Sequence, residues 1–566
     1  MTNVNYGTHA GSEDPSESER PCSKTTNNEP IHDEECPLLP PSTHTGSKIT
    51  GVTGIGTIIA ILLLGELVSN ADATLVLACE GLISSEFNRL RDASWLSTGY
   101  SLGLCAVQPM YGKSSDIYGR KPLLILSYVL FAIGCIIWYV NPNTEFSVDI
   151  CAVFDICGAS GIASNMSTVI LGRAIGGLGG AGTMVISSVI ITDIVPKRDV
   201  ATWRAYVNIS MTLGRSIGGP LGGWLSDTIG WRWLFLGQAP FMALAAFLVF
   251  FILPGQPETK SGKSKIQQVD FLGSGLLAAA IVCLTGLMDQ GGKSFAWNSL
   301  ISYVLSIGGI ILLLGFIVVE AYVAKDPIFN LRILRRSNVG ASYILSTLQV
   351  TAQLGMLFSV PLYFQVTQQA STTMAGIHLV PAVVGNTLGG LLAGIFIKKT
   401  GCYKPLLVAA GLIAAISYAL LYLKWDGQTG FWESFYIIPG GFGTGMASAA
   451  AFIAMTATLP SEEVAMATAG YMMLIGFAMT AGVTMSNSVL GIEFERELRR
   501  NLRGPGSERI IKRAIADTAY IAQLGAKLRE IVLECFLGGL KHTYLVSLTC
   551  SLAAAFMGLF IQHHQL

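Results

Sequence analysis

Charged residues are scarce in this chain of 566 residues, at 13% of the sequence, whereas ordinary soluble proteins carry about 25%. This deficit argues against a soluble multidomain enzyme and against a disordered protein. Lys and Arg total 36 and Asp and Glu total 36, so no net charge favours a nucleic-acid partner. The sequence also lacks a phosphate loop, a nucleotide fingerprint and a metal-ligand cluster, so we expect no enzyme activity, no cofactor and no metal.

The spacing of the eleven cysteines matches neither a zinc site nor a disulfide framework. Several of them lie inside apolar runs, where a thiol behaves as a small buried hydrophobe. The first apolar run begins after about fifty polar residues. We therefore expect no cleavable signal peptide.

Long apolar runs are what the sequence has in abundance. About fourteen of them approach the roughly 20 residues that a helix needs to cross a bilayer. The expected spans are 51–78, 94–111, 122–140, 165–192, 205–225, 233–253, 271–289, 298–323, 338–363, 376–397, 405–424, 433–457, 465–490 and 542–562. The pattern predicts an all-α polytopic membrane protein embedded in a lipid bilayer.

Basic residues in the short loops predict the orientation of these spans. Alternate loops are rich in Lys and Arg, for example Lys197, Arg198 and Arg204, and such loops stay in the cytosol. Both termini are then cytosolic. The long loop 491–541 falls on the luminal side, and its periodicity over 510–533 predicts a helix that forms either a cap or a lid.

Four regions follow from these spans: a disordered cytosolic tail (1–48), a first bundle (49–253), a linker with two extra spans (254–337) and a second bundle (338–566). Residues 141–158 interrupt the turn between the third and fourth spans. They are either an insertion or an untrimmed intron, and we assign them no function.

The tail contains an acidic residue, Glu34, four positions before the apolar pair Leu38 and Leu39. An exposed apolar pair in a charged cytosolic tail suits docking to a coat adaptor. The motif resembles an acidic dileucine sorting signal, which would direct the protein to the vacuole or lysosome. The alternative is a chance match, because the pattern is short.

A compact motif follows the second span and predicts a tight cytosolic turn. Its residues are Gly112, Asp116, Gly119, Arg120 and Lys121. The glycines permit the turn, and Asp116 can pair with Arg120 or with charges on neighbouring helices as two helical bundles rock. The motif resembles the gating loop of the major facilitator superfamily. The alternative is a positively charged loop without a further role.

Three further segments strengthen that resemblance, which covers residues 50–562. Arg173 begins a run similar to the family's R-x-x-x-G-x-G motif, and Asp72 and Thr74 resemble a signature of the fourteen-span drug:proton antiporter branch. The fifth span resembles the branch's antiporter motif, in which glycines on one face remove bulk and a proline bends the helix. The residues of this motif are Gly214, Gly218, Gly219, Pro220 and Gly223.

Ionisable groups inside a membrane are costly, so they usually face a cavity and carry function. Asp72 is the strongest candidate for binding a proton or a cationic substrate, and Glu66 is a second acid in the same span. The alternatives are a structural hydrogen bond of Asp72 to Thr74 or to a neighbouring helix, and a Glu66 that only faces the cytosolic funnel. By resemblance, Arg173 relays protons, and the alternative is a structural arginine bonded to backbone carbonyls. Arg215 either pairs with one of the acids or orients a substrate carboxylate. The uncharged candidates for the cavity are Thr74, Gln349, Gln353 and Asn386, although such residues more often bridge helices.

The resemblance implies two six-helix bundles with two inserted helices and a substrate site between the bundles. Within the branch, the sequence is most similar to the fungal vacuolar basic amino acid transporters. We therefore expect an antiporter that exchanges luminal protons for a cationic amino acid at the vacuolar membrane. The alternatives are a multidrug, toxin or siderophore exporter at the plasma membrane, and a nutrient sensor that does not transport.

Overall fold

The computed structural model describes most of the chain after residue 51. The described residues are 52–87, 94–139, 166–254, 270–291, 295–323, 331–334, 337–370, 372–430, 432–503, 507–516 and 518–564. The tail motif of Glu34, Leu38 and Leu39 and the segment 141–158 lie outside them. The expectations about a sorting signal and an insertion therefore stay predictions.

Hydrocarbon offers no hydrogen-bond partners, so each spanning segment must satisfy its own backbone groups, as an α-helix does. Fourteen helices of 19 residues or more account for most of the described residues. They are α1 (Val52–Glu86), α2 (Ser94–Tyr118), α3 (Arg120–Tyr139), α5 (Met166–Ile194), α6 (Lys197–Thr228), α7 (Trp231–Ile252), α8 (Phe271–Gln290), α9 (Leu300–Val318), α11 (Ser337–Thr367), α13 (Val380–Thr400), α14 (Lys404–Lys424), α15 (Ile438–Thr456), α16 (Ser461–Asn501) and α18 (Ala526–Phe560).

Eleven of these helices are long and apolar enough to cross a membrane by length and composition. The other three are α2 and α6, which carry more polar side chains, and α8, which is apolar over Leu272–Met288. The arrangement is compatible with the fourteen predicted spans, and the chain is a multi-pass helical membrane protein.

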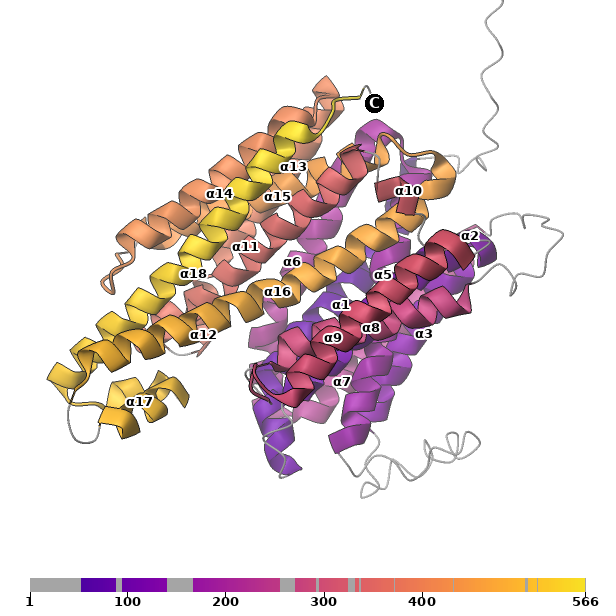
Figure 1. Ribbon diagram of the computed structural model, residues 1–566. Coiled ribbons are helices and arrows are strands. Elements are labelled where there is room, and N and C mark those ends of the chain that lie inside the picture. Colours follow the sequence, from indigo (N-terminus) through magenta and orange to yellow (C-terminus); the bar gives the residue numbers. More distant parts are fainter. Residues whose placement is uncertain are drawn as a thin grey trace, which may run out of the picture. The chain divides into compact units, whose positions relative to one another are not determined.

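The predicted loop 491–541 is largely helical, which corrects its expected boundaries. Helix α16 continues to Asn501 instead of ending at 490, and α18 begins at Ala526 instead of 542. Between them lie the short elements α17 (Ser507–Ala516) and η5 (Thr518–Gln523), with α17 beside the end of α16 (Figure 1). The expected helix over 510–533 is therefore split into three pieces. Ile511, Ala514 and Ile521 pack into the hydrophobic core formed with α16 and α18, as expected of a cap.

Helix contacts fall into two groups with α8 and α9 beside them. In the N-terminal group, α1 packs on α6, α2 and α3 pack on α5, and α7 packs on α3. In the C-terminal group, α11 and α14 pack on α18, and α13 packs on α15. The residue boundaries proposed for the bundles and the linker remain predictions.

The two groups meet through a few specific helix pairs. Helix α6 contacts α13 and α15, while α2 and α5 contact α16. At the end of the helices that carries the turn at Gly119, Lys398 forms an ion pair with Asp199 across 2.9 Å, joining α13 to α6. Near this end the N-terminal and C-terminal groups are therefore in contact.

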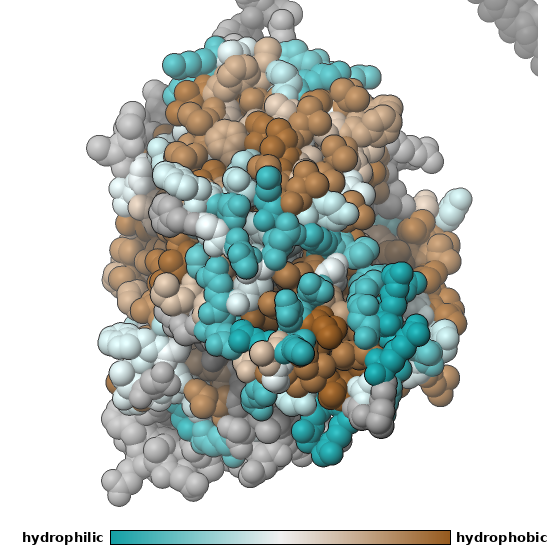
Figure 2. Space-filling view, turned by 90° about the vertical axis from the view of Figure 1, so that its left-hand side faces the viewer, coloured by the Kyte–Doolittle hydropathy of each residue, from teal (hydrophilic) through white to brown (hydrophobic). Residues whose placement is uncertain are grey.

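Apolar side chains cover much of the exterior. Helix α9 leaves Leu300, Ile307 and Ile311 more than half exposed, as expected of side chains that face lipid. One face of the molecule is shown in Figure 2, where hydrophobic side chains occupy the upper part and hydrophilic ones gather across the middle and lower right.

Candidate functional site

Asp72 and Arg173 form a buried ion pair between α1 and α5. Arg173 Nη1 donates to Asp72 Oδ2, and the two side chains are 4% and 1% exposed. The guanidinium also donates through Nε to the carbonyl oxygen of Leu96, at 3.2 Å, and lies 4.4 Å from the ring centre of Tyr100. The Tyr100 hydroxyl is 2.9 Å from the Ser69 hydroxyl, which links α2 back to α1. The structure thus joins two residues that the sequence analysis named separately.

Glu66 and Arg215 belong to a second network, in which Asn70 is the bridge. Arg215 Nε donates to Asn70 Oδ1 at 3.0 Å, and Asn70 Nδ2 donates to the Glu66 carbonyl at 2.8 Å and to Glu66 Oε2 at 3.4 Å. The expected pairing of Arg215 with an acid of the first span is therefore indirect. The reason is that Asn70, one turn after Glu66 on α1, fills the space between them.

Each of the two acids keeps one oxygen atom without a hydrogen-bond partner among the described residues. These atoms are Asp72 Oδ1 and Glu66 Oε1, and both are buried. An ion pair removed from water is stable only if its geometry and further hydrogen bonds repay the desolvation of both charges. Each of these buried acids therefore keeps hydrogen-bonding capacity that the described residues do not fill.

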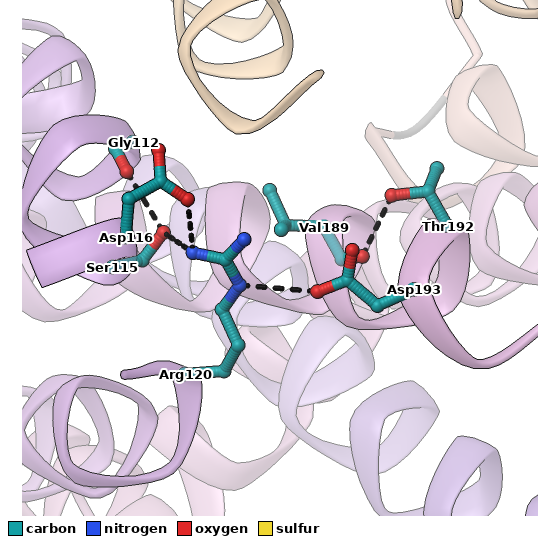
Figure 3. Close-up of polar contacts among 7 residues, drawn as sticks. All are labelled: Gly112, Ser115, Asp116, Arg120, Val189, Thr192 and Asp193. Atoms are coloured by element: carbon teal, nitrogen blue, oxygen red, sulfur yellow. Dashed lines mark hydrogen bonds and ion pairs between the residues drawn. The ribbon is translucent and has the colours of Figure 1, made fainter. Parts of the chain in front are cut away.

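Arg120 is the centre of the predicted gating motif (Figure 3). Its Nη1 donates to Asp116 Oδ1 at 2.5 Å and to Ser115 Oγ at 2.8 Å, and its Nε donates to Asp193 Oδ2 at 3.1 Å. Gly119 has a φ of +90°, a conformation that glycine adopts without strain, and this turn brings Arg120 back onto α2. The cluster ties together α2, α3 and the end of α5, all within the N-terminal group.

Contact between the groups at this motif comes from Gly112. A Cβ atom on Gly112 would lie 2.6 Å from Ala469 Cβ and 2.9 Å from the Ala465 carbonyl oxygen, both on α16. Lys121 lies on the other side of the turn, 5.3 Å from the ring centre of Phe250 on α7. The motif therefore combines a charged cluster inside one group with a close approach to the other.

The sequence predicted that the glycines of the antiporter motif on α6 lie on one helix face. Only some of them do. A Cβ on Gly214 would lie 2.5 Å from the Leu67 carbonyl oxygen, and one on Gly218 would collide with Ala71 and Thr74, so these glycines let α6 approach α1. Gly219 and Gly223 have nothing within 4 Å of that position, because helical periodicity turns them to another face. Pro220, which lies inside the helix, leaves the Ser216 carbonyl without its helical donor.

Of the predicted cavity residues, Gln349 bridges helices instead of pointing at an open space. Its Nε2 donates to Thr444 Oγ1 and its Oε1 accepts from Ser551 Oγ, both at 3.1 Å. Thr74 donates to the Ala71 carbonyl on its own helix at 3.1 Å. Gln353 is buried on α11.

Asn386 has a different place, at the boundary between the two groups. Its Oδ1 accepts a hydrogen bond of 2.6 Å from Asn208 Nδ2, which joins α13 to α6. Of the four uncharged candidates, Asn386 is therefore placed where rocking of the groups would break its contact.

Arg204 is a residue that the sequence analysis misplaced. We expected it in a cytosolic loop, but α6 begins at Lys197, so Arg204 lies two turns inside the helix. Its guanidinium donates to Ser188 Oγ and lies 4.1 Å from the ring centre of Phe452 on α15. It also interacts electrostatically with Glu66. The signal that could have revealed it is the apolar periodicity of residues 200–207 around it.

Several known proteins are similar to this chain in sequence. A vacuolar membrane amino acid uptake transporter of Schizosaccharomyces pombe, fnx2, is 29% identical over 92% of this chain and 86% of its own. The multidrug resistance protein fnx1 of the same yeast is 28% identical over 86% and 89%. The vacuolar basic amino acid transporter 2 of Saccharomyces cerevisiae is 26% identical over 80% and 94%.

Solved structures agree on the fold. A variant of the xylose transporter XylE aligns with a TM-score of 0.57 at 16% identity, over 91% of this chain and 97% of its own. Residues 62–483 match the family described as the Major Facilitator Superfamily. With its helices, its two contact groups and this match, the chain belongs to the major facilitator superfamily, a family of transporters.

Proposed function

We propose that the protein is a proton-coupled antiporter that moves basic amino acids into the vacuole by alternating access. The observation that carries the proposal is the pair of buried carboxyl groups on α1, Asp72 and Glu66, each with one unbonded oxygen and each linked to an arginine. Two relatives bear vacuolar amino acid transport in their names, which supports the substrate class and the membrane.

The proposed coupling follows from the ion pair. Protonation of Asp72 on the acidic side neutralises it and weakens its hold on Arg173, which changes the contacts between α1 and α5. Release of the proton on the other side restores the pair. Because a buried charge is stable only when it is compensated, substrate and proton are bound in alternation, which is the requirement for antiport.

The substrate is tested with the purified protein in liposomes under an imposed pH gradient, acidic inside. We expect labelled Lys, Arg and His to accumulate, and we expect dissipation of the gradient with an ionophore to abolish accumulation. Empty liposomes are the control. Absence of gradient-dependent uptake for all three amino acids would refute the proposed substrate class.

Export of a drug or toxin is the second candidate, and it is favoured by the similarity to a multidrug resistance protein over 86% of the chain. The same liposomes distinguish the two functions. A cationic dye or drug that accumulates under the gradient, without competition from a hundredfold excess of lysine, would favour export.

Sorting at the vacuole is predicted from the tail and not from the fold. Replacement of Leu38 and Leu39 by Ala should move a fluorescently tagged protein from the vacuolar to the plasma membrane, because the adaptor would lose its apolar contact. The matched control replaces Pro40 and Pro41, which follow the pair. If the double-alanine protein still outlines the vacuole, the tail motif is not the signal.

A further inference from the structure

Gln108 is a buried amide that the ion pairs of the proposed mechanism do not use. It lies just past the middle of α2, has no exposed surface, and neither Oε1 nor Nε2 has a hydrogen-bond partner among the described residues. A buried polar group without a partner is costly, because it has lost its bonds to water and gained none from the protein. Two such atoms on one side chain call for a reason, and a ligand that bonds them in another state of the protein is one.

The surroundings of Gln108 are the seam where α2 meets α16 of the other group. A Cβ on Gly476 of α16 would lie 2.9 Å from Cys105 Sγ and 3.6 Å from Gln108 Oε1. Further along, the α16 residues that approach α2 are Ala465 and Ala469. At these points α16 offers glycine and alanine, so it supplies no side-chain donor or acceptor to the amide.

A second polar atom lies one turn from Gln108 on the same helix. Pro109 is inside α2 and has no N–H group, so the carbonyl of Cys105 lacks the donor that a continuous helix provides. Cys105 and Gln108 are three residues apart and share a helix face. Gln108 thus offers a side-chain donor and a side-chain acceptor beside α16, and the Cys105 carbonyl is a backbone acceptor one turn away on α2.

We propose that Gln108 and the Cys105 carbonyl bind the α-amino and α-carboxyl groups of the substrate when α2 and α16 separate. The amide Nε2 donates to the carboxylate, while Gln108 Oε1 and the Cys105 carbonyl accept from the ammonium group. In the closed seam of this structure the amide is buried without a hydrogen-bond partner among the described residues. This inference rests on the proposed amino acid transport and names the part of the substrate that this seam recognises.

The test compares Gln108→Leu with wild type in lysine uptake by proteoliposomes, and measures competition by cadaverine, which is lysine without its carboxylate. We expect the KM for lysine to rise at least about tenfold, because the variant loses both the Nε2 bond to the carboxylate and the Oε1 bond to the ammonium group, and one lost hydrogen bond to a charged group accounts for about tenfold. We also expect the preference for lysine over cadaverine to fall about tenfold, since both compounds lose the ammonium contact but only lysine loses the carboxylate contact. A purely structural role would leave that preference unchanged.

The matched control is Gln238→Leu. Gln238 is also buried and also has an unbonded Oε1, but it lies on α7, which packs on α3 and α1 within its own group. We expect this variant to keep the wild-type preference. We further expect Gln108→Leu to melt no lower than wild type, because leucine removes two unbonded polar atoms from an apolar seam.

Two results would overturn the inference: an unchanged KM and lysine preference in Gln108→Leu, or a lower melting temperature, which would show that the amide is bonded in the closed seam. Wild-type uptake separates this outcome from failure of the proposed function. If wild type takes up none of the basic amino acids, both proposals are refuted. If wild type takes up lysine and Gln108→Leu is unaltered, the inference alone is refuted.

Discussion

Asp72→Asn should abolish lysine accumulation under a pH gradient while leaving exchange of lysine across the membrane without a gradient. Asparagine keeps the shape of the side chain but cannot bind and release a proton. Paired measurements in the same proteoliposomes check this result, with gradient-driven uptake in one arm and exchange in the other. Normal accumulation by Asp72→Asn would rule Asp72 out as the coupling acid, and Glu66→Gln would then be tested in the same way.

The same substitution should also destabilise the protein, because it removes the carboxylate with which Arg173, at 4% exposure, forms a buried ion pair. Removing one partner of a buried pair costs about 3–5 kcal/mol. The double variant Asp72→Asn with Arg173→Gln removes both charges and should recover most of the melting temperature. It should not recover accumulation. That contrast separates a defect in coupling from a defect in folding.

Asp116→Ala should lower the transport rate at least tenfold while the protein still folds and is sorted normally. The substitution removes the 2.5 Å partner of Arg120, which then has only Ser115 and Asp193 to hold it at the turn. The turn positions Gly112 against α16, so a loosened turn would slow the change between the two conformations. Initial uptake rates at equal amounts of reconstituted protein measure the effect.

The matched control for that experiment is Asp426→Ala. Asp426 also forms a 2.5 Å ion pair, with Lys541. It follows the C-terminal end of α14, away from the gating motif, and its side chain is more exposed than that of Asp116. Exposed pairs contribute about 0–1 kcal/mol, so we expect its rate to equal that of wild type. Equal rates for Asp116→Ala and Asp426→Ala would mean that the gating motif does not control transport.

The fold could be predicted from the sequence because the signals for membrane-spanning helices are local. A run of apolar residues predicts a membrane-spanning helix from its own composition, and Gly119 predicts a turn. Neither prediction depends on contacts with distant parts of the chain. Boundaries were harder to predict. Asn501 ends α16 eleven residues beyond the expected end, since charged side chains such as Arg499 and Glu495 pair along the helix and prolong it outside the apolar run.

The candidate site was predictable only as a set of residues and not as a set of pairs. Asp72, Glu66, Arg173 and Arg215 stand out because charge is rare in apolar runs, but their pairing depends on how α1, α5 and α6 are rotated. The sequence could not show that Asn70 separates Glu66 from Arg215. Gln108 escaped notice for the same reason, because an amide becomes informative only when its surroundings are known to be apolar.

The length of α16 has a mechanical consequence. Its 41 residues span about 60 Å at 1.5 Å per residue, twice the roughly 30 Å of bilayer hydrocarbon. Near its start the helix is in contact with α2, and its far end bears α17. Its far half packs on α11 and α18, so a tilt of the C-terminal group about the contact with α2 would displace the far end of α16 the most. A label on Arg500, which is 76% exposed near the tip, would convert a small tilt at the seam into a displacement large enough to follow in single molecules.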